Sequence, residues 1–254
     1  MKAVRALAPW LLVAGLLLAW ELACRLLRVP AYFLPAPTAI LRAIVQGGPS
    51  LVASGAATLV MALSALALAV AATIPLALAA ALSPTLARAV QPLAATLQVT
   101  PVVAIAPLAV IWAGLDHPER AITALAALVA FFPVFSGALT GLRSADPDLE
   151  RLFDLYGAGA WDRLWRLKLP SAVPFLLEGV KVAAGLSVIG AVVAEFVAGS
   201  GAAQGLAWKI LEAGQRLRTA DMFAALIALG VMGAGLNAGF GAFERLLLRR
   251  WRGR

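Results

Sequence analysis

Long apolar runs, separated by short polar stretches, follow one another along the whole chain. A helix needs about 20 mostly apolar residues to cross roughly 30 Å of hydrocarbon. The stretches that reach this length lie near residues 7–27, 57–82, 89–112, 121–142, 175–198 and 222–248. They are too long, and too rich in alanine and leucine, for the strands of a membrane barrel, which are about ten residues each and alternate in polarity. The pattern therefore predicts an all-α membrane protein with six transmembrane helices in a single domain, residues 1–254.

The composition supports a membrane environment and narrows the possible chemistry. Of the 254 residues, 62% are hydrophobic and 13% are charged, whereas soluble domains carry about 25% charged residues. Cys24 is the only cysteine, so it cannot form an internal disulfide. His117 is the only histidine, which argues against a His/Cys zinc site with its three or four ligands. We therefore expect no metal site in this chain.

The first apolar run has a second interpretation, as a signal peptide. Basic residues precede it, and Leu22-Ala23-Cys24 resembles a lipoprotein cleavage site. However, Glu21 stands three residues before the cysteine, where such a site has an aliphatic residue. We therefore expect the run to be retained as the first span.

Basic residues predict the orientation in the membrane. Most of the 21 lysines and arginines lie in the N-terminal segment, the second and fourth loops, and the C-terminal tail. Because cytoplasmic loops carry the excess of positive charge, both termini are predicted to be cytoplasmic. Topology thus accounts for the net charge of +8, and no separate basic domain points to nucleic acid.

The fourth loop, about 143–174, is longer and denser in charge than the other loops. Asp146 followed by Pro147 is typical of a helix start, with Asp146 as the N-cap. This helix is predicted to end at Tyr156, because Gly157 supplies the usual C-terminal stop. The loop is therefore predicted to contain at least one short helix.

A second short helix is predicted from Gly159 to Leu169, since the residue before Pro170 is pushed out of helical geometry. Helical spacing puts one set of its residues on a common face: Trp161, Leu164, Trp165 and Lys168. Tryptophan and basic residues suit an amphipathic helix resting on lipid headgroups. They also suit a docking element for a soluble cytoplasmic protein, and composition alone leaves both interpretations open.

The order of residues in this loop favours the docking element. From residue 151 the chain reads RLFDLYGAGAWDRLWRLKLPSAVP. This resembles the coupling loop of ATP-binding cassette (ABC) importer permeases, with its signature Glu-Ala-Ala, three residues, Gly, nine residues, Ile-x-Leu-Pro. Gly157, Leu169 and Pro170 are kept at their spacing, and Leu167 stands for the isoleucine. Arg151-Leu152-Phe153 replaces Glu-Ala-Ala, which removes the carboxylate that the family places there.

Other segments resemble the sulfonate, taurine and nitrate branch of this family. They occur in order along the chain, at residues 20–23, 33–37, 58–59, 74–77, 100–107, 111–114 and 193–195. The resemblance therefore covers nearly the whole chain.

The resemblance implies a permease subunit of an importer in the bacterial inner membrane, and not an enzyme. It implies a peripheral first span, about 7–27, and core spans within about 57–248. The implied partners are a second permease copy, two cytoplasmic ABC ATPase subunits that bind ATP and Mg, and a periplasmic or lipid-anchored solute-binding protein. The implied solute is a small anion, such as a sulfonate or nitrate, or a small heterocycle. The residues implied to contact the ATPase are Gly157, Ala158, Gly159, Ala160, Trp161, Leu164, Trp165, Leu169 and Pro170.

The sequence contains no Gly-x-x-x-x-Gly-Lys-Ser/Thr phosphate loop. Any ATP-driven role therefore needs a partner chain that binds ATP. Prolines interrupt spans two to four, and the backbone groups that they free are tolerated beside a water-filled cavity. Thr96, Gln98 and Thr100 are therefore candidates for the wall of a translocation pathway, or else they are helix-packing groups. We expect this chain to hold no cofactor of its own.

Glu195, near the outer end of the fifth span, is an ionisable residue in a membrane segment and hence a functional candidate. The alternative is an interfacial carboxylate that reaches water. Glu178 with Lys181, and Glu21 with Arg25, are spaced to form ion pairs along a helix.

Two glycine pairs, Gly137-x-x-x-Gly141 and Gly235-x-x-x-Gly239, would allow close approach of helices. In a chain with 22 glycines such pairs also arise by chance.

Rival functions have less support. A rhomboid-type protease needs a Gly-x-Ser-Gly motif and a membrane histidine, whereas Gly199-Ser200-Gly201 lacks that spacing and His117 lies in a loop. An ion-driven secondary carrier places charges at the bilayer midplane and often has inverted repeats, and neither is evident here. The carrier remains the main alternative.

Overall fold

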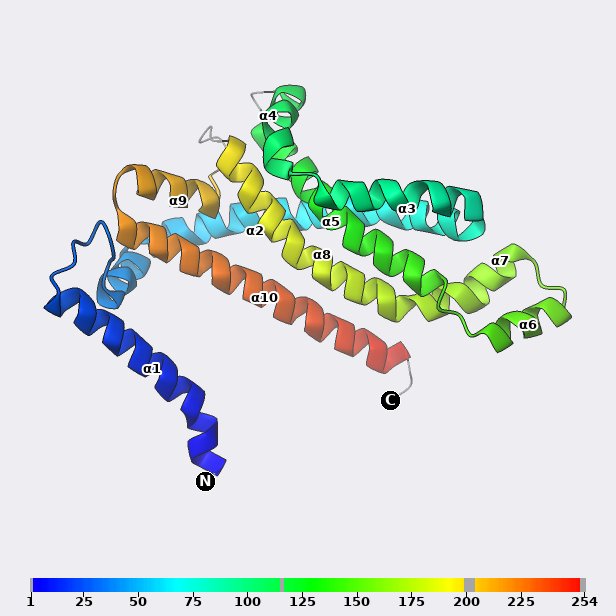
Figure 1. Cartoon of the computed structure of the whole chain (residues 1–254), viewed down its shortest axis with the longest axis horizontal. Helices are drawn as coiled ribbons and strands as arrows, with labels where there is room; N and C mark the ends of the chain where they lie inside the picture. The colour runs from blue at the N-terminus through cyan, green and yellow to red at the C-terminus, as the bar shows by residue number, and fades with distance from the viewer. Residues whose placement is uncertain (1, 115–116, 199–203, 252–254) are drawn as a thin grey trace. The chain divides into compact units, whose positions relative to one another are not determined.

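The computed structural model describes residues 2–114, 117–198 and 204–251, without the side chains of residues 2–8, 10, 250 and 251. Every regular element in this part of the chain is helical (Figure 1), which confirms the predicted all-α class. The elements are α1 (Lys2–Leu26), α2 (Pro37–Leu82), α3 (Pro84–Val99), α4 (Val102–Ala113), α5 (Pro118–Leu142), α6 (Pro147–Leu155), α7 (Ala160–Arg163), the π-helix η1 (Leu164–Lys168), α8 (Leu169–Ala198), α9 (Leu206–Gln215) and α10 (Thr219–Trp251).

Within the described chain, four helical stretches are long and apolar enough to cross a membrane: Pro37–Leu82, Pro118–Leu142, Ala160–Ala198 and Thr219–Arg249. The pair α3 and α4 meets the same criterion together but is bent by 98°, as in a broken span or a re-entrant loop. The structure thus supports a membrane protein with four such spans, or five with the bent pair. The first predicted span coincides with α1, whose side chains fall partly outside the described residues, and the number six stays a prediction.

Two predicted spans have different limits in the structure. The second, predicted to begin near residue 57, belongs to α2, which begins at Pro37 and is 46 residues long. The third, predicted to be continuous, is broken between α3 and α4. The Thr100 N–H closes α3, and Pro101, which has no N–H to continue the helical hydrogen bonds, becomes the N-cap of α4.

The chain forms two compact units. Unit 1 comprises Met1–Ala57 and Gln204–Val231, and unit 2 comprises Thr58–Ala203 and Met232–Arg254. Whether these two units form the single domain predicted from the sequence is not decided by this division, and the single domain stays a prediction.

In unit 1, Glu21 joins the end of α1 to the start of α2. Its carboxylate accepts hydrogen bonds from the Thr38 N–H (3.0 Å), the Thr38 hydroxyl (2.8 Å) and the Arg25 side chain (2.7 Å). The predicted pairing with Arg25 is confirmed, and the carboxylate also satisfies an N–H in the first turn of α2, where negative charge is favoured. In the same unit, the Thr219 hydroxyl donates to the Tyr32 carbonyl at 2.6 Å, which holds the start of α10 against the loop after α1.

The centre of unit 2 is the contact between α5 and α8. A Cβ atom at Gly137 would come within 2.7 Å of the Phe175 carbonyl oxygen, and one at Gly141 within 2.8 Å of the Ala172 Cα. From α8, Gly179 faces α5 equally closely. Because close backbone approach supplies the van der Waals contact that holds membrane helices together, the first glycine pair is a packing feature. Around the pair at 235 and 239, an added Cβ would meet nothing within 4 Å.

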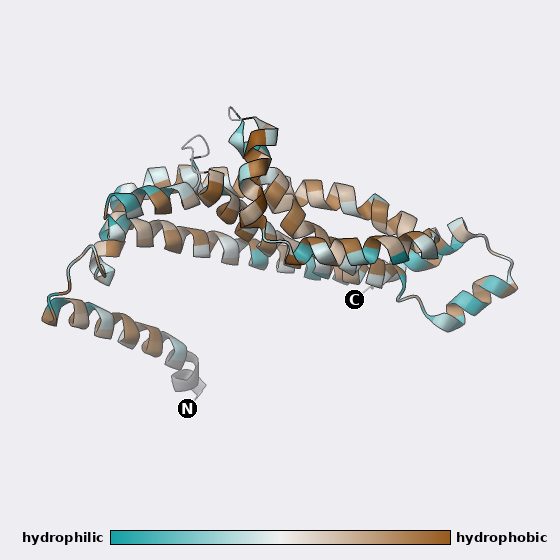
Figure 2. Cartoon of the chain, turned by 45° about the horizontal axis from the view of Figure 1, so that its top comes forward, coloured by the Kyte–Doolittle hydropathy of each residue, from teal (hydrophilic) through white to brown (hydrophobic). Residues whose placement is uncertain are grey.

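Beside this contact lies a cluster of buried apolar residues drawn from α2, α3, α5, η1 and α8. Its larger members include Phe135, Leu139, Leu142 and Leu164. Figure 2 shows that the long helices are mainly hydrophobic, whereas the short helix α6 is mainly hydrophilic. Through Leu164, the cluster joins η1 to the membrane helices.

Candidate functional site

The polar segment after α5 begins with the predicted helix. Asp146 caps α6, since its side chain accepts a hydrogen bond from the Asp148 N–H at 2.9 Å, and Pro147 takes the first helical position. Tyr156 is the C-cap, and Gly157 follows with a φ of +64°, a conformation that disfavours side chains. The predicted start and stop are both confirmed.

The second predicted helix does not end at Leu169. Ala160–Arg163 forms α7, the next turn, Leu164–Lys168, is the π-helix η1, and α8 continues through Pro170. In a π turn each N–H pairs with the carbonyl five residues back, and the Leu169 N–H donates to the Leu164 carbonyl. The turn therefore closes without the N–H that proline lacks, the helix runs on, and the prediction of an end at Leu169 is wrong.

Burial divides these residues differently from the predicted faces. Leu164 and Leu167 are only 1% and 5% exposed, whereas Trp161 and Trp165 are 64% and 62% exposed. The prediction that Leu164 shares a face with the tryptophans is wrong. Successive residues of a helix are about 100° apart, so α5 can cover Leu164 while the adjacent Trp165 stays exposed.

Two ion pairs brace α6 against the helix that follows it. Arg163 lies 2.6 Å from the Asp154 carboxylate and also donates to the Ala158 carbonyl at 3.1 Å. Lys168 lies 3.4 Å from the Glu150 carboxylate. Neither pair could be predicted from helical spacing, because the partners lie on different helices. Together they connect α6 to α7 and η1. We name residues 146–170, which include the α6 and α7 helices of Figure 1, the lever segment.

The turn within the lever segment is flanked by exposed apolar side chains. Leu155 and Tyr156, before the turn, are 85% and 82% exposed, and the two tryptophans follow it. Gly159 is the N-cap of α7, next to the exposed Ala160. Exposed apolar patches of this kind mark surfaces that contact other molecules.

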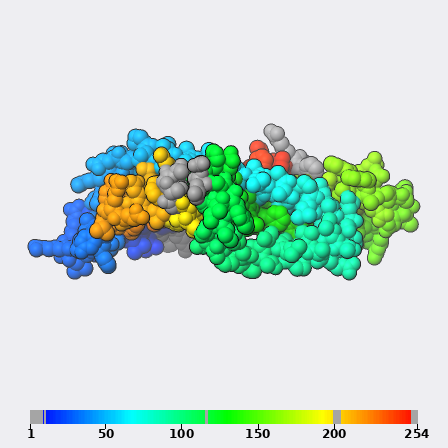
Figure 3. Space-filling view, turned by 90° about the horizontal axis from the view of Figure 1, so that it is seen from above, coloured from blue at the N-terminus to red at the C-terminus, as the bar shows by residue number. Residues whose placement is uncertain are grey.

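The predicted pathway residues lie apart from this segment. Thr96 and Gln98 are exposed on α3, which lies open on the surface in Figure 3. The Thr96 hydroxyl donates to the Pro92 carbonyl at 2.9 Å, and the Thr100 hydroxyl to the Thr96 carbonyl at 2.8 Å. Both hydroxyls therefore bond to the backbone of their own helix.

Glu195 is buried, at 2% exposure, and its carboxylate accepts a hydrogen bond of 2.9 Å from the hydroxyl of the fully buried Thr58. The alternative of an interfacial carboxylate reaching water is therefore wrong for this chain. Burial of a carboxylate requires hydrogen-bond partners, and Thr58, on α2, is one that the sequence did not indicate.

A three-residue charge cluster links α8 to α10 within unit 2. Lys181 lies 3.3 Å from Glu178, as predicted, and 3.2 Å from Glu244. Glu244 is far away in sequence, so its part was missed.

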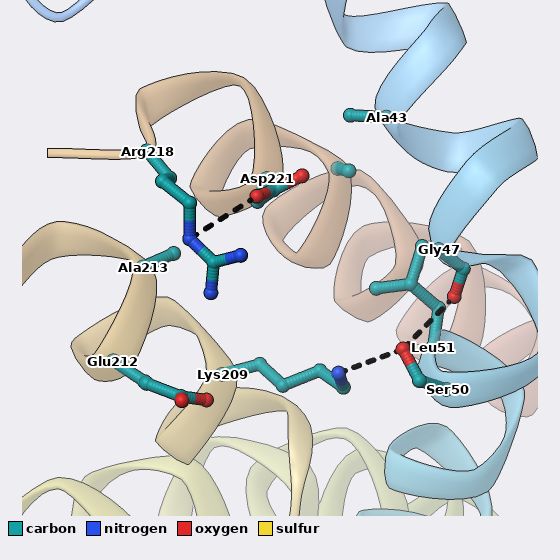
Figure 4. A pocket seen from close by; sticks show the side chains of 10 residues that line it. Ala43, Gly47, Ser50, Leu51, Lys209, Glu212, Ala213, Arg218 and Asp221 are labelled. Atoms are coloured by element: carbon teal, nitrogen blue, oxygen red, sulfur yellow. Dashed lines mark hydrogen bonds and ion pairs between the residues drawn. The ribbon is translucent and has the colours of Figure 1, made fainter. Parts of the chain in front are cut away.

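Unit 1 contains a polar pocket of about 150 Å³ that the sequence did not reveal (Figure 4). The Lys209 ammonium points across it and donates to the Ser50 hydroxyl at 2.9 Å. Arg218 and Asp221 face each other at 3.5 Å on a second wall. The polar residues of α9 alternate with apolar ones at helical spacing, which is the signal that could have identified this helix.

Comparison with known proteins identifies the family of this chain. The family described as "Binding-protein-dependent transport system inner membrane component" matches residues 73–253. The formylaminopyrimidine transport permease protein of Halalkalibacterium halodurans is 32% identical over 99% of this chain and 98% of its own length. The riboflavin transport system permease protein of Chloroflexus aurantiacus is 36% identical over 92% and 86%, and an aliphatic sulfonates transport permease protein of Escherichia coli is 31% identical over 95% and 91%. The chain belongs to the family of inner membrane components of binding-protein-dependent transport systems.

Proposed function

We propose that the lever segment is the site at which a separate ATPase drives this ABC permease subunit. Family membership implies an ATPase and a solute-binding protein as partners in general. The observation that carries the proposal is the exposure of Trp161 and Trp165 on a helix that runs without interruption into α8. Tryptophan is enriched among the residues that dominate protein interfaces, because it offers a large, rigid contact area.

The buried side of the lever segment supports the same role. Leu164 anchors η1 in the cluster that contains Phe135 and Leu139 of α5, and the ion pairs of Arg163 and Lys168 stiffen the segment. A partner that moves the tryptophans would therefore displace α8 and its contacts, whereas a loosely attached loop would absorb the motion. A partner can drive the change only by binding its two conformations with different affinities.

The full assembly follows from this role. We propose six spans, with α1 as the first and the bent pair α3–α4 as the third, and with both termini in the cytoplasm of a bacterial cell. Two permease copies, two ATPases that hold ATP and Mg, and one binding protein form the importer. The solute is a small anion or heterocycle, which agrees with the range of solutes named for the relatives. Thr96, Gln98, Thr100 and Glu195 stay candidates for the pathway.

The test is ATPase stimulation by the loaded binding protein in reconstituted vesicles. Replacing Trp161 and Trp165 together by alanine removes the contact, and Gly157→Val forces a β-branched side chain into a left-handed conformation. Both variants are expected to insert in the membrane and to lose stimulation. The matched control is Trp112→Ala, which removes a tryptophan that is 77% exposed on α4. Full ATPase stimulation in both lever variants would contradict the proposal and would show that the lever segment is only a surface helix. Failure of any ATPase to co-purify with the wild-type chain would favour an ion-driven carrier.

A further inference from the structure

Unit 2 contains a cavity of about 180 Å³ between α3 and α5. Its wall includes Gln91 from α3, the α5 residues Phe132, Phe135, Ser136 and Thr140, and Arg143, the C-cap of α5. Positions 132, 136, 140 and 143 follow one another at intervals of three or four residues, so helical geometry places them on a common face, with Phe135 beside it. The cavity is therefore built by two neighbouring membrane helices near the end of α5.

The polar groups of the wall are hydrogen-bond donors, and the only charge among them is positive. The wall offers a guanidinium, two hydroxyls and a primary amide, and no carboxylate lines the cavity. Gln91, Thr140 and Arg143 are exposed and Ser136 is half-buried, and within the part of the chain that the structure describes none of these four side chains bonds to another protein group. Each of these groups can donate a hydrogen bond. One positive charge among free donors is complementary to a small anion.

We propose that this cavity is a subsite for the oxyanion group of the transported solute, such as a sulfonate, phosphate or carboxylate; this rests on the proposed function as a permease. Arginine recognises such groups with two parallel hydrogen bonds, and the hydroxyls and the amide complete the set of donors. A cavity of about 150 Å³ holds a benzene molecule. The subsite therefore takes an anionic head with a short carbon chain or a single ring.

The cavity shares its apolar wall with the lever segment. Phe135 lines the cavity and also belongs to the buried cluster that contains Leu164. Because packed interiors respond to displacement by repacking and not by smooth deformation, a movement of Leu164 changes the shape of the cavity. The subsite is thus placed where the state of the ATPase would control how tightly an anion is held.

The test measures protection of a thiol in the cavity. Ala95 also lines it, and Cys24, the only native cysteine, is replaced by alanine, so that Ala95→Cys supplies a single reactive group. The permease is placed in nanodiscs of phosphatidylcholine, without ATPase or nucleotide, and the rate of maleimide labelling is followed with increasing ethanesulfonate. Dimethyl sulfone, a neutral sulfonyl compound, is the control ligand.

We expect ethanesulfonate, and not dimethyl sulfone, to slow labelling. Arg143→Ala should weaken protection about tenfold or more, as expected for the loss of a charged hydrogen bond. Arg120→Ala, at the other end of α5, should leave it unchanged. Thr140→Val, which keeps the charge and the shape, should weaken protection severalfold and serves if the arginine variant does not fold.

Three results would overturn the subsite. These are equal protection by the neutral sulfone, undiminished protection in the Arg143 and Thr140 variants, and protection that appears only when phosphatidylglycerol is added, which would assign the cavity to a lipid headgroup. Because no ATPase is present, these results are independent of the stimulation test. Protection in a chain that binds no ATPase would keep the anion site and refute the importer.

Discussion

The two glycine pairs allow one motif to be tested in two environments. Gly137 and Gly141 face the backbone of α8, whereas around Gly235 and Gly239 an added Cβ would meet nothing within 4 Å. Alanine at both positions of each pair is the smallest change that adds a Cβ. The two double variants should therefore move stability in opposite directions, although their sequence patterns are alike.

The contact distances set the magnitude. A Cβ at Gly141 would lie 2.8 Å from the Ala172 Cα, 2.9 Å from the Ala172 carbonyl oxygen and 2.9 Å from the Phe175 Cβ. Ordinary close contacts between carbon and oxygen are about 3.3–3.6 Å, so α5 and α8 must separate. Overpacking costs about 1–3 kcal/mol per site, and alanine regains up to about 1 kcal/mol per site in helix propensity. The pair on α5 should thus lose about 2 kcal/mol, and the pair on α10 should gain about 1–2 kcal/mol.

The assay is thermal unfolding of the purified chain in detergent, followed by circular dichroism. For a chain of this length, about 1 kcal/mol corresponds to about 2–4 °C in Tm, so the two double variants should differ by roughly 10 °C. Gly185→Ala is the matched control on α8, since it too has nothing within 4 Å. The close contact of α5 and α8 would be refuted if the two double variants had equal Tm values, or if the α10 variant had a lower Tm than the α5 variant.

Two further predictions concern the lever segment and the charge cluster. Leu164→Ala should destabilise the chain by about 2–5 kcal/mol because it opens a cavity in the buried cluster, whereas Trp165→Ala, at an exposed site, should stay within about 0.5 kcal/mol; the same unfolding assay compares them. In double-mutant cycles, Lys181 should couple more strongly to Glu244 than to Glu178, because the Glu244 side chain is 18% exposed and the Glu178 side chain 56% exposed. Stronger coupling to Glu178 would show that the link between α8 and α10 is not formed.

Local rules predicted those parts of the lever segment that depend on neighbouring residues. The cap at Asp146 and the stop at Gly157 follow from side-chain chemistry and backbone conformation within a few positions. The continuation of the helix through Pro170 does not follow from neighbouring residues alone. It depends on a π turn whose Leu164 is buried in the cluster with Phe135 and Leu139 of α5, and a rule about the residue before proline contains no information on such tertiary packing.

The same distinction explains the buried charges and the cavity. The pair Glu178–Lys181 is visible as a helical spacing, but Glu244 joins it from another helix. Glu195 is notable in sequence as a membrane carboxylate, yet its burial against Thr58 depends on how α2 packs on α8. Gln91 and Arg143 likewise come to line one cavity only when the unit folds. Sequence periodicity predicts which residues share a helix face and cannot predict which face another helix covers.

Burial of the two exposed tryptophans by the ATPase could by itself shift the permease between its two conformations. This requires that nearly all of the buried area form in only one of these conformations. An aromatic side chain can bury about 150–250 Å², and Trp161 and Trp165 are 64% and 62% exposed, so together they offer roughly 200–300 Å². At about 25 cal/mol per Å² this amounts to about 5–8 kcal/mol before the costs of association. Moving a two-state equilibrium from 1:99 to 99:1 requires about 5.5 kcal/mol of differential binding. Since the two quantities are similar, one tryptophan provides only about half of the requirement. Either single alanine variant should therefore retain partial ATPase stimulation, and the double variant should lose it.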